Sequence, residues 1–360
     1  MSHTKGKADD TASSIAGTST LLLAVALGLL VLLAWRLSDV LILLFGAVIL
    51  AVALGAVAAP LQRRLHLSQR VAVGVTVTLT VIVITTGSWL VGDQLVEQAN
   101  DLRERLPAAL DKLVAWANSF RLGVAVQELW ADANTEDVPW ASVANAATRT
   151  LGAIGSMGLL LVVAVYLAAD PTLYRLGLVR LVPPAYRARI DGALLASGEA
   201  LGRWLLGQGV SMLFVGSATA IGLALLGVPL ALTVGLIAGV LAFVPFFGPI
   251  ASGLLAVLLA FMQGPTQALY VVGLSVAIQQ IEGNLLMPWV QRWAVELPPV
   301  LGITAAVIFG LLFGLPGVIL ATPLMVVAMV LVQKLYVEGL LEAKEERSEA
   351  PRRSEPGAQP

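Results

Sequence analysis

Four uninterrupted apolar stretches in the first half of the chain limit the fold more than any other feature. They cover about residues 18–36, 39–60, 71–92 and 150–169, and each approaches the roughly 20 residues that a helix needs to cross a 30 Å hydrocarbon core. Composition agrees, because 58% of the 360 residues are hydrophobic and only 12% are charged, against about a quarter charged in an ordinary soluble domain. The sequence therefore predicts an all-α polytopic membrane protein.

Arginines predict how the chain is oriented in its membrane. The loop 61–70 carries Arg63, Arg64 and Arg70 without an acid, and residues 170–204 carry five arginines against three acids. Segment 93–149 instead holds nine acids against five bases. By the positive-inside rule, we expect the two arginine-rich segments and both termini in the cytoplasm of a bacterial inner membrane, and the acidic segment outside.

These patterns divide the chain into seven parts. Asp170-Pro171 predicts a helix N-cap followed by Pro at the first helical position. The helices after it are either an interfacial gate or coupling element, or a cytoplasmic lead-in to the next span, which is the interpretation we favour. The expected parts are a disordered cytoplasmic tail (1–17), three transmembrane helices (18–92), an extracytoplasmic helical segment (93–149), a fourth transmembrane helix (150–169), cytoplasmic amphipathic helices (170–204), a transport core with broken helices (205–335) and a polar cytoplasmic tail (336–360).

Glycine and proline interrupt two long apolar runs in the second half, 230–262 and 300–333. Either both runs are kinked spans, which gives about eight transmembrane segments, or they are re-entrant hairpins that enter from opposite faces, with 266–287 as the span between them. Backbone groups freed by a break must line a cavity or be buried in protein, and paired broken segments indicate a transporter's binding site. The alternative is that Pro kinks only shape helix packing. The candidate break residues are Pro229, Pro245, Gly248, Pro249, Pro288, Gly314, Pro316, Gly317 and Pro323.

Glu282 is the candidate coupling residue. Only Glu282, Arg292 and Glu296 are charged between residues 207 and 333, and an ionisable group at membrane depth normally faces a polar cavity or a partner. Gln279, Gln280 and Asn284 lie within about one helical turn of it. The cluster could bind a proton or Na⁺, or anchor a polar solute. The alternative is an interfacial carboxylate paired with Arg292.

Several function classes lack the residues that they need. The chain has no cysteine and two histidines, which opposes metal sites and thiol chemistry. Residues 207–333 contain no His, Lys, Cys or Asp, so we do not expect an intramembrane enzyme. No phosphate-binding Gly-Lys-Ser/Thr loop occurs, which opposes direct use of ATP, and a net charge of −1 opposes nucleic-acid binding. We expect no cofactor beyond coupling to H⁺ or Na⁺.

The order and spacing of several short motifs resemble the AI-2E family of bacterial permease-like transporters, which is named for export of autoinducer-2. The resemblance covers roughly residues 18–335 and implies an inner-membrane carrier of about eight helical segments. Some relatives are assigned to autoinducer-2 export and others to Na⁺(Li⁺)/H⁺ antiport. It also adds Gln208 to the transport candidates. The matching motifs are Asp170-Pro171, Leu205-Leu206-Gly207-Gln208, Gly227-Val228-Pro229, Val244-Pro245-Phe246-Phe247-Gly248-Pro249, Gln280-Ile281-Glu282-Gly283-Asn284, Pro288, Phe313-Gly314-Leu315-Pro316-Gly317-Val318 and Ala321-Thr322-Pro323.

The leading hypothesis is thus a secondary transporter. It would export a small polar solute or exchange a monovalent cation for protons, with the lipid bilayer as its surroundings. The outside helical segment also offers a surface for assembly into a homo-oligomer. The alternative is a non-transporting membrane scaffold or regulatory subunit that acts through the outside segment and the C-terminal tail.

Overall fold

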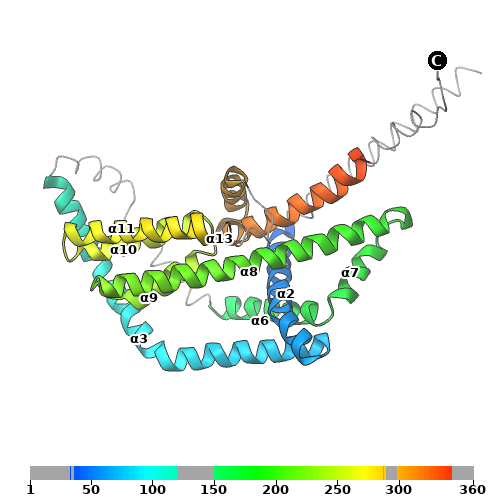
Figure 1. Ribbon diagram of the computed structural model, residues 1–360, viewed down its shortest axis with the longest axis horizontal. Helices are drawn as coiled ribbons and strands as arrows, with labels where there is room; N and C mark the ends of the chain where they lie inside the picture. Colours follow the sequence, from blue (N-terminus) through cyan, green and yellow to red (C-terminus); the bar gives the residue numbers. More distant parts are fainter. Residues whose placement is uncertain (1–32, 34–35, 120–149, 287, 289–297, 343–360) are drawn as a thin grey trace, which may run out of the picture.

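The computed structural model describes residues 33, 36–119, 150–286, 288 and 298–342. Within these ranges the chain forms helices and short turns, with no strand (Figure 1), so the all-α prediction is confirmed. The expected first span, 18–36, lies almost wholly outside the described residues, as does the predicted loop near 133–139. The helices are α2 (Ser38–Leu65), α3 (Gln69–Ser119), α6 (Thr150–Ala169), α7 (Pro171–Arg180), η1 (Pro184–Tyr186), α8 (Arg187–Leu225), α9 (Ala231–Leu241), α10 (Phe247–Phe261), α11 (Pro265–Ile281), η2 (Glu282–Leu286), α13 (Pro299–Val332) and η3 (Gln333–Glu342).

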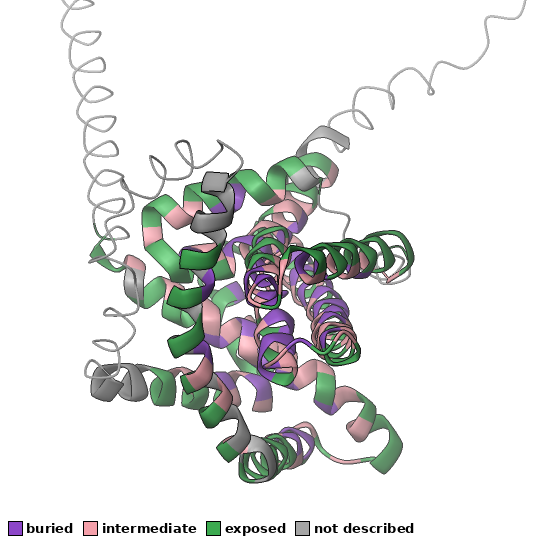
Figure 2. Cartoon of the chain, turned by 90° about the vertical axis from the view of Figure 1, so that its left-hand side faces the viewer, coloured by how far each residue is buried: buried purple, intermediate pink, exposed green. Residues whose placement is uncertain are grey.

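Small residues bring α2 and α6 together. Ala47, Ala51 and Ala58 on α2 share one buried cluster with Ala164 and Ala168 on α6. Small side chains let helix backbones approach closely, which matters in lipid because the lipid tails are as apolar as leucine. The outer faces of the helices remain exposed and apolar, while buried residues lie on their inner sides (Figure 2). Apolar side chains on the exposed faces are typical of helices surrounded by lipid.

The third apolar stretch does not end at the membrane surface. It continues as α3, one helix of 51 residues that also contains the first part of the acidic segment. At 1.5 Å per residue it is about 77 Å long, more than twice the roughly 30 Å of a hydrocarbon core. The second half of α3 contacts the core: Gln98 Oε1 accepts from Thr233 Oγ1 at 2.8 Å, and Lys112 Nζ donates to the Met262 carbonyl at 3.2 Å.

The chain bends sharply after the fourth apolar helix. Asp170 is the N-cap of α7 and accepts a hydrogen bond from the Leu173 amide at 3.3 Å, with Pro171 at the first helical position, as the sequence predicted. The bend between α6 and α7 is 88°. If α6 crosses a membrane, α7 therefore runs along its surface, and α8 then begins the lead-in and continues as one helix into the next span.

The run 230–262 is a helical hairpin. Its arms α9 and α10 have 11 and 15 residues, or about 17 and 23 Å, which is too short for either arm to cross the core. At the open end, Gln263 donates to the Gly227 carbonyl at 2.9 Å, which joins both ends of the hairpin. At the tip, a Cβ on Gly248 would collide with the Leu241 carbonyl, so only glycine allows this approach.

The run 300–333 is also a hairpin. By length and hydropathy Val300–Glu338 would pass for one span, and Ala305 and Ala321 would be about 24 Å apart in a straight helix. They instead share one small buried cluster with Ala306. The reversal occurs at Gly314, whose φ of 65° and ψ of −148° are open mainly to glycine.

The two hairpins enter from opposite ends of the helix assembly. The open end of the first lies beside the second half of α3. The second hairpin returns toward the end of the helices that carries the arginine-rich segments 61–70 and 170–204. There Val326 and Val330 pack with Ala200 and Leu201 of α8. Both runs therefore fold back on themselves, which is the chain path expected of re-entrant hairpins and not of single kinked helices. Five helices of the described residues are long and apolar enough to span, or six if α6 and α7 form one bent span; α13 counts among them although it folds back at Gly314.

Candidate functional site

The tip of the first hairpin is fastened to α8. Gln208, which is only 4% exposed, donates from Nε2 to the carbonyl of Ala242 at 2.6 Å. Ala242 follows the last residue of α9, where helix carbonyls have no partner within the helix. Beside it, the rings of Trp204 and Phe243 meet edge to face with centroids 5.8 Å apart. The side chain of Gln208 thus supplies the hydrogen bond that the helix end leaves unmade, and lipid could not supply it.

Glu282 lies close to the same face of α8. It begins the π-helical turn η2 at the end of α11 and is half-buried. Its Oε1 accepts a short hydrogen bond from the hydroxyl of Ser211, which is 1% exposed. Ser211 follows Gln208 by three residues, a spacing that places both side chains on one helix face. The face of α8 that contacts the hairpin tip therefore also contacts Glu282.

A small cavity adjoins Glu282. Its volume is about 20 Å³, enough for one water molecule, which needs about 10–15 Å³. The wall contains hydroxyl, amide and carboxylate groups, so a water or a small cation would find oxygen partners there. The lining residues are Val215 and Thr219 of α8, Pro249, Ser252, Gly253 and Ala256 of α10, and Ser275, Ile278, Gln279 and Glu282 at the end of α11.

The predicted polar cluster divides between two faces. Gln279, Gln280 and Asn284 are all exposed, but only Gln279 lines the cavity together with Glu282. Gln280 and Asn284 pair with each other, Asn284 Nδ2 donating to Gln280 Oε1 at 2.6 Å. Neighbouring residues on a helix point about 100° apart, so closeness in sequence does not bring all four together. Arg292, the alternative partner of Glu282, lies outside the described residues.

The glycine and proline candidates have different roles in the two hairpins. Pro229 lies in the turn before α9, and Pro245 lies in the break itself. Gly314 is the reversal point of the second hairpin, and Pro323 is buried within its return arm without breaking it. Pro288 is exposed after η2. The remaining candidates lie in the first turns of the arms that follow each reversal: Gly248 and Pro249 in α10, and Pro316 and Gly317 in α13.

Ser211 is the site residue that the sequence analysis missed. Its spacing of three from Gln208 was visible in the sequence, but serine is common on packed membrane helices, where it usually bonds to its own backbone. Only the fold places its hydroxyl against a carboxylate 71 residues away.

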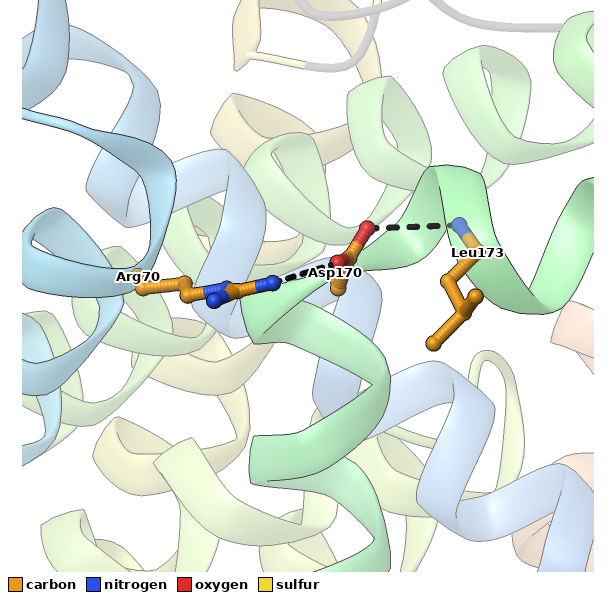
Figure 3. Close-up of polar contacts among 3 residues, drawn as sticks. All are labelled: Arg70, Asp170 and Leu173. Carbon is orange, nitrogen blue, oxygen red and sulfur yellow. Dashed lines mark hydrogen bonds and ion pairs between the residues drawn. The ribbon is translucent and has the colours of Figure 1, made fainter.

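A second polar contact fixes the arginine-rich end (Figure 3). Arg70 Nη2, at the start of α3, lies 2.9 Å from Asp170 Oδ2, at the bend between α6 and α7. The Arg70 hydrogen bond, followed by that from the Leu173 amide, holds the pKa of the Asp170 carboxyl below its usual range. Gln69 Nε2 adds a hydrogen bond to the Ala168 carbonyl at 3.1 Å. The two loops that were predicted to share one side of the membrane thus meet.

The described residues contain no group of three or more His, Cys, Asp or Glu that could hold a metal ion. Within that part of the chain, the polar groups at the first hairpin tip are therefore suited to hydrogen bonding, proton binding or weak coordination of a monovalent cation. They do not resemble a site for a tightly bound transition metal.

Comparisons with known proteins relate the chain to transport proteins. The chain is 32% identical over 145 residues to YueF of Bacillus subtilis (strain 168), covering 40% of this chain and 39% of the relative. It is 35% identical over 147 residues to MT0215 of Mycobacterium tuberculosis, covering 39% and 40%. A longer match, 24% identical over 277 residues, covers 73% of this chain and 79% of sll0060 of Synechocystis. All three relatives are provisionally named as transport proteins.

The stronger matches are partial, since the chain spans about two-fifths of the length of YueF and MT0215. A family model described as AI-2E family transporter, however, matches residues 21–336, which includes both hairpins, α8 and Glu282. This protein belongs to the AI-2E transporter family.

Proposed function

We propose that this protein is a secondary transporter that exports a small polar solute of the autoinducer-2 kind or exchanges a monovalent cation for protons. The observation that carries the proposal is the pair of hairpins entering from opposite ends, with Glu282 and Ser211 beside the tip of the first. Broken helices of this kind are tolerated at membrane depth where they line a cavity or pack against protein. The family match and the names of the relatives support the same function.

Glu282 is the proposed coupling group. Its carboxylate changes charge when it binds H⁺ or a monovalent cation, which changes the electrostatics of a site with little water. Ser211 can accommodate both states, because a hydroxyl donates to the charged carboxylate and accepts from the protonated one. The contact can therefore persist while the charge beside the hairpin tip switches.

Proteoliposomes test this role. With an imposed pH or Na⁺ gradient, Glu282→Gln should reduce coupled flux by at least about tenfold, because the amide cannot titrate. Glu104→Gln is the matched control, since Glu104 is an exposed carboxylate on α3 that does not line the cavity beside Glu282. Coupled flux that is unchanged in Glu282→Gln would refute the coupling role. Absence of flux in the wild type under every gradient would instead favour the non-transporting scaffold.

We also propose that the Arg70–Asp170 end faces the cytoplasm of a bacterial inner membrane, with both termini on that side. The support is that the arginines of 61–70 and 170–204 lie at one end of the helices. Because the chain lacks cysteine, single cysteines can report the orientation. An impermeant maleimide added to intact cells should label Thr266→Cys, at the start of α11, and leave His66→Cys unlabelled; the opposite pattern would invert the topology.

A further inference from the structure

A large groove lies apart from the hairpin tips, between α2, the bend from α6 to α7, and the first half of α8. Its volume is about 820 Å³, within the range of about 300–1,000 Å³ for small-molecule sites. Its wall on α2 runs from Val48 to Arg63 and is made mostly of small residues, including Gly55, Ala56 and Ala59. The fifteen helical steps from Val48 to Arg63 span about 22 Å, somewhat more than one leaflet of a 30 Å hydrocarbon core.

Three arginines from three different helices line this groove. They are Arg63 at the end of α2, Arg175 on α7 and Arg203 on α8. Arg175 Nη1 pairs with Asp191 at 2.6 Å, while Arg203 Nη2 lies 3.9 Å from Glu199. Among the described residues, no hydrogen bond or ion pair engages Arg63. Glu199 is the only acid in the described part of the lining, and with Asp191 counted against Arg175 the groove still carries an excess of positive charge from Arg63.

The helix that closes the groove is suited to a membrane surface. The 88° bend directs α7 along the surface that α6 crosses, and α7 exposes Leu173, Tyr174, Leu176 and Leu178. A short helix with exposed apolar side chains and arginines is typical of the boundary between headgroups and acyl chains. The charged part of the groove therefore lies at headgroup level, and the small-residue wall of α2 extends toward the hydrocarbon.

We propose that this groove binds one anionic phospholipid. An acyl chain lies along the small residues of α2, and the phosphate lies among Arg63, Arg175 and Arg203. Guanidinium groups match the geometry of phosphate oxygens, and the excess positive charge favours an anionic lipid over a zwitterionic one. The lipid would join α2 and α7 to α8 at a corner that the side chains of the described residues leave open.

Lipid binding to the purified full-length protein tests the charged part. Phosphatidylglycerol and phosphatidylcholine are titrated separately and followed by native mass spectrometry. At about 1 kcal/mol per basic residue, Arg63→Gln with Arg203→Gln should weaken phosphatidylglycerol binding roughly thirtyfold. The matched control is Arg64→Gln with Arg180→Gln, which removes the same charge from the same two regions outside the groove and should leave binding within about twofold. Inorganic phosphate alone should not displace the lipid.

Filling the groove tests the apolar part without changing charge. Gly55 and Gly198 line the groove, and a Cβ at either position would meet no other part of the described chain within 4 Å beyond its own helix. Because the open groove lies beyond that Cβ, the side chain of Gly55→Leu or Gly198→Leu should occupy the space of the acyl chain. Gly273→Leu is the control, because Gly273 has equal room and lies outside the groove. We expect tenfold or greater loss of phosphatidylglycerol binding in the first two variants only.

Three results would overturn the proposal. The first is equal binding of phosphatidylglycerol and phosphatidylcholine, and the second is an equal loss in the test and control variants. The third is a stable dimer that retains no lipid, which would assign the groove to a second copy of the chain. Coupled flux can fail in the same samples without affecting these results, because binding is measured without a gradient.

Discussion

Gln208→Met gives the sharpest test of how the first hairpin is held. Methionine has nearly the same length as glutamine but cannot donate a hydrogen bond. The substitution leaves the Ala242 carbonyl without its 2.6 Å partner in a buried position. Leaving one buried acceptor unpaired costs about 1–3 kcal/mol.

Because the hydrogen bond is local, we expect the loss to appear as easier opening of the tip rather than as global unfolding. The amides of Phe243 and Gly248 donate to Val240 and Val244 within the tip, so they report its opening. A cost of about 1–3 kcal/mol corresponds to amide exchange about fivefold to a hundredfold faster at these positions. Hydrogen exchange of the protein in lipid nanodiscs, read by mass spectrometry, measures this change.

Gln280→Met is the matched control. Gln280 is exposed and contacts Asn284, so we expect an effect of at most about 0.5 kcal/mol. Exchange in the Gln208→Met tip that stays within twofold of the wild type would refute the reasoning. Equal acceleration in both variants would show that the effect comes from the loss of any amide and not from the contact to Ala242.

Two further predictions concern packing and pH. A Cβ on Gly235 would lie 2.5 Å from the Ala220 Cβ, so Gly235→Ala should destabilise the protein by about 1–3 kcal/mol in denaturant unfolding, whereas Gly273→Ala should not; equal midpoints would contradict the packing. Hydrogen bonds to the carboxylate lower the pKa of Asp170, so its charged form contributes stability above about pH 4 that is lost as the pH falls further. The difference in stability between wild type and Asp170→Asn should thus be constant above pH 5 and shrink at lower pH; a constant difference down to pH 2 would contradict this.

The sequence by itself determined those features that depend on short stretches of chain. Lipid leaves helices as the only structure that an isolated apolar stretch can adopt, so the helical class was predictable from 39–60 and 150–169. The cap at Asp170 is equally local, because its carboxylate accepts from an amide three residues ahead. Gly314 could be located as a break because a positive φ is a property of a single residue.

Only the tertiary structure decided whether each broken run extends as one kinked helix or folds back as a hairpin. That choice depends on contacts such as that of Ala305 with Ala321, and the two topologies place the same local breaks at the same residues. The partner of Glu282 was hidden for the same reason, since Ser211 reaches it across 71 residues. Which of Gln279 and Gln280 faces the cavity was likewise decided by the packing of α8 and α10 against α11, although the angle between the two side chains is a local property of the helix. Local chemistry fixes where a helix begins, caps and breaks, while the pairing of polar groups in a site requires that distant helices have already packed.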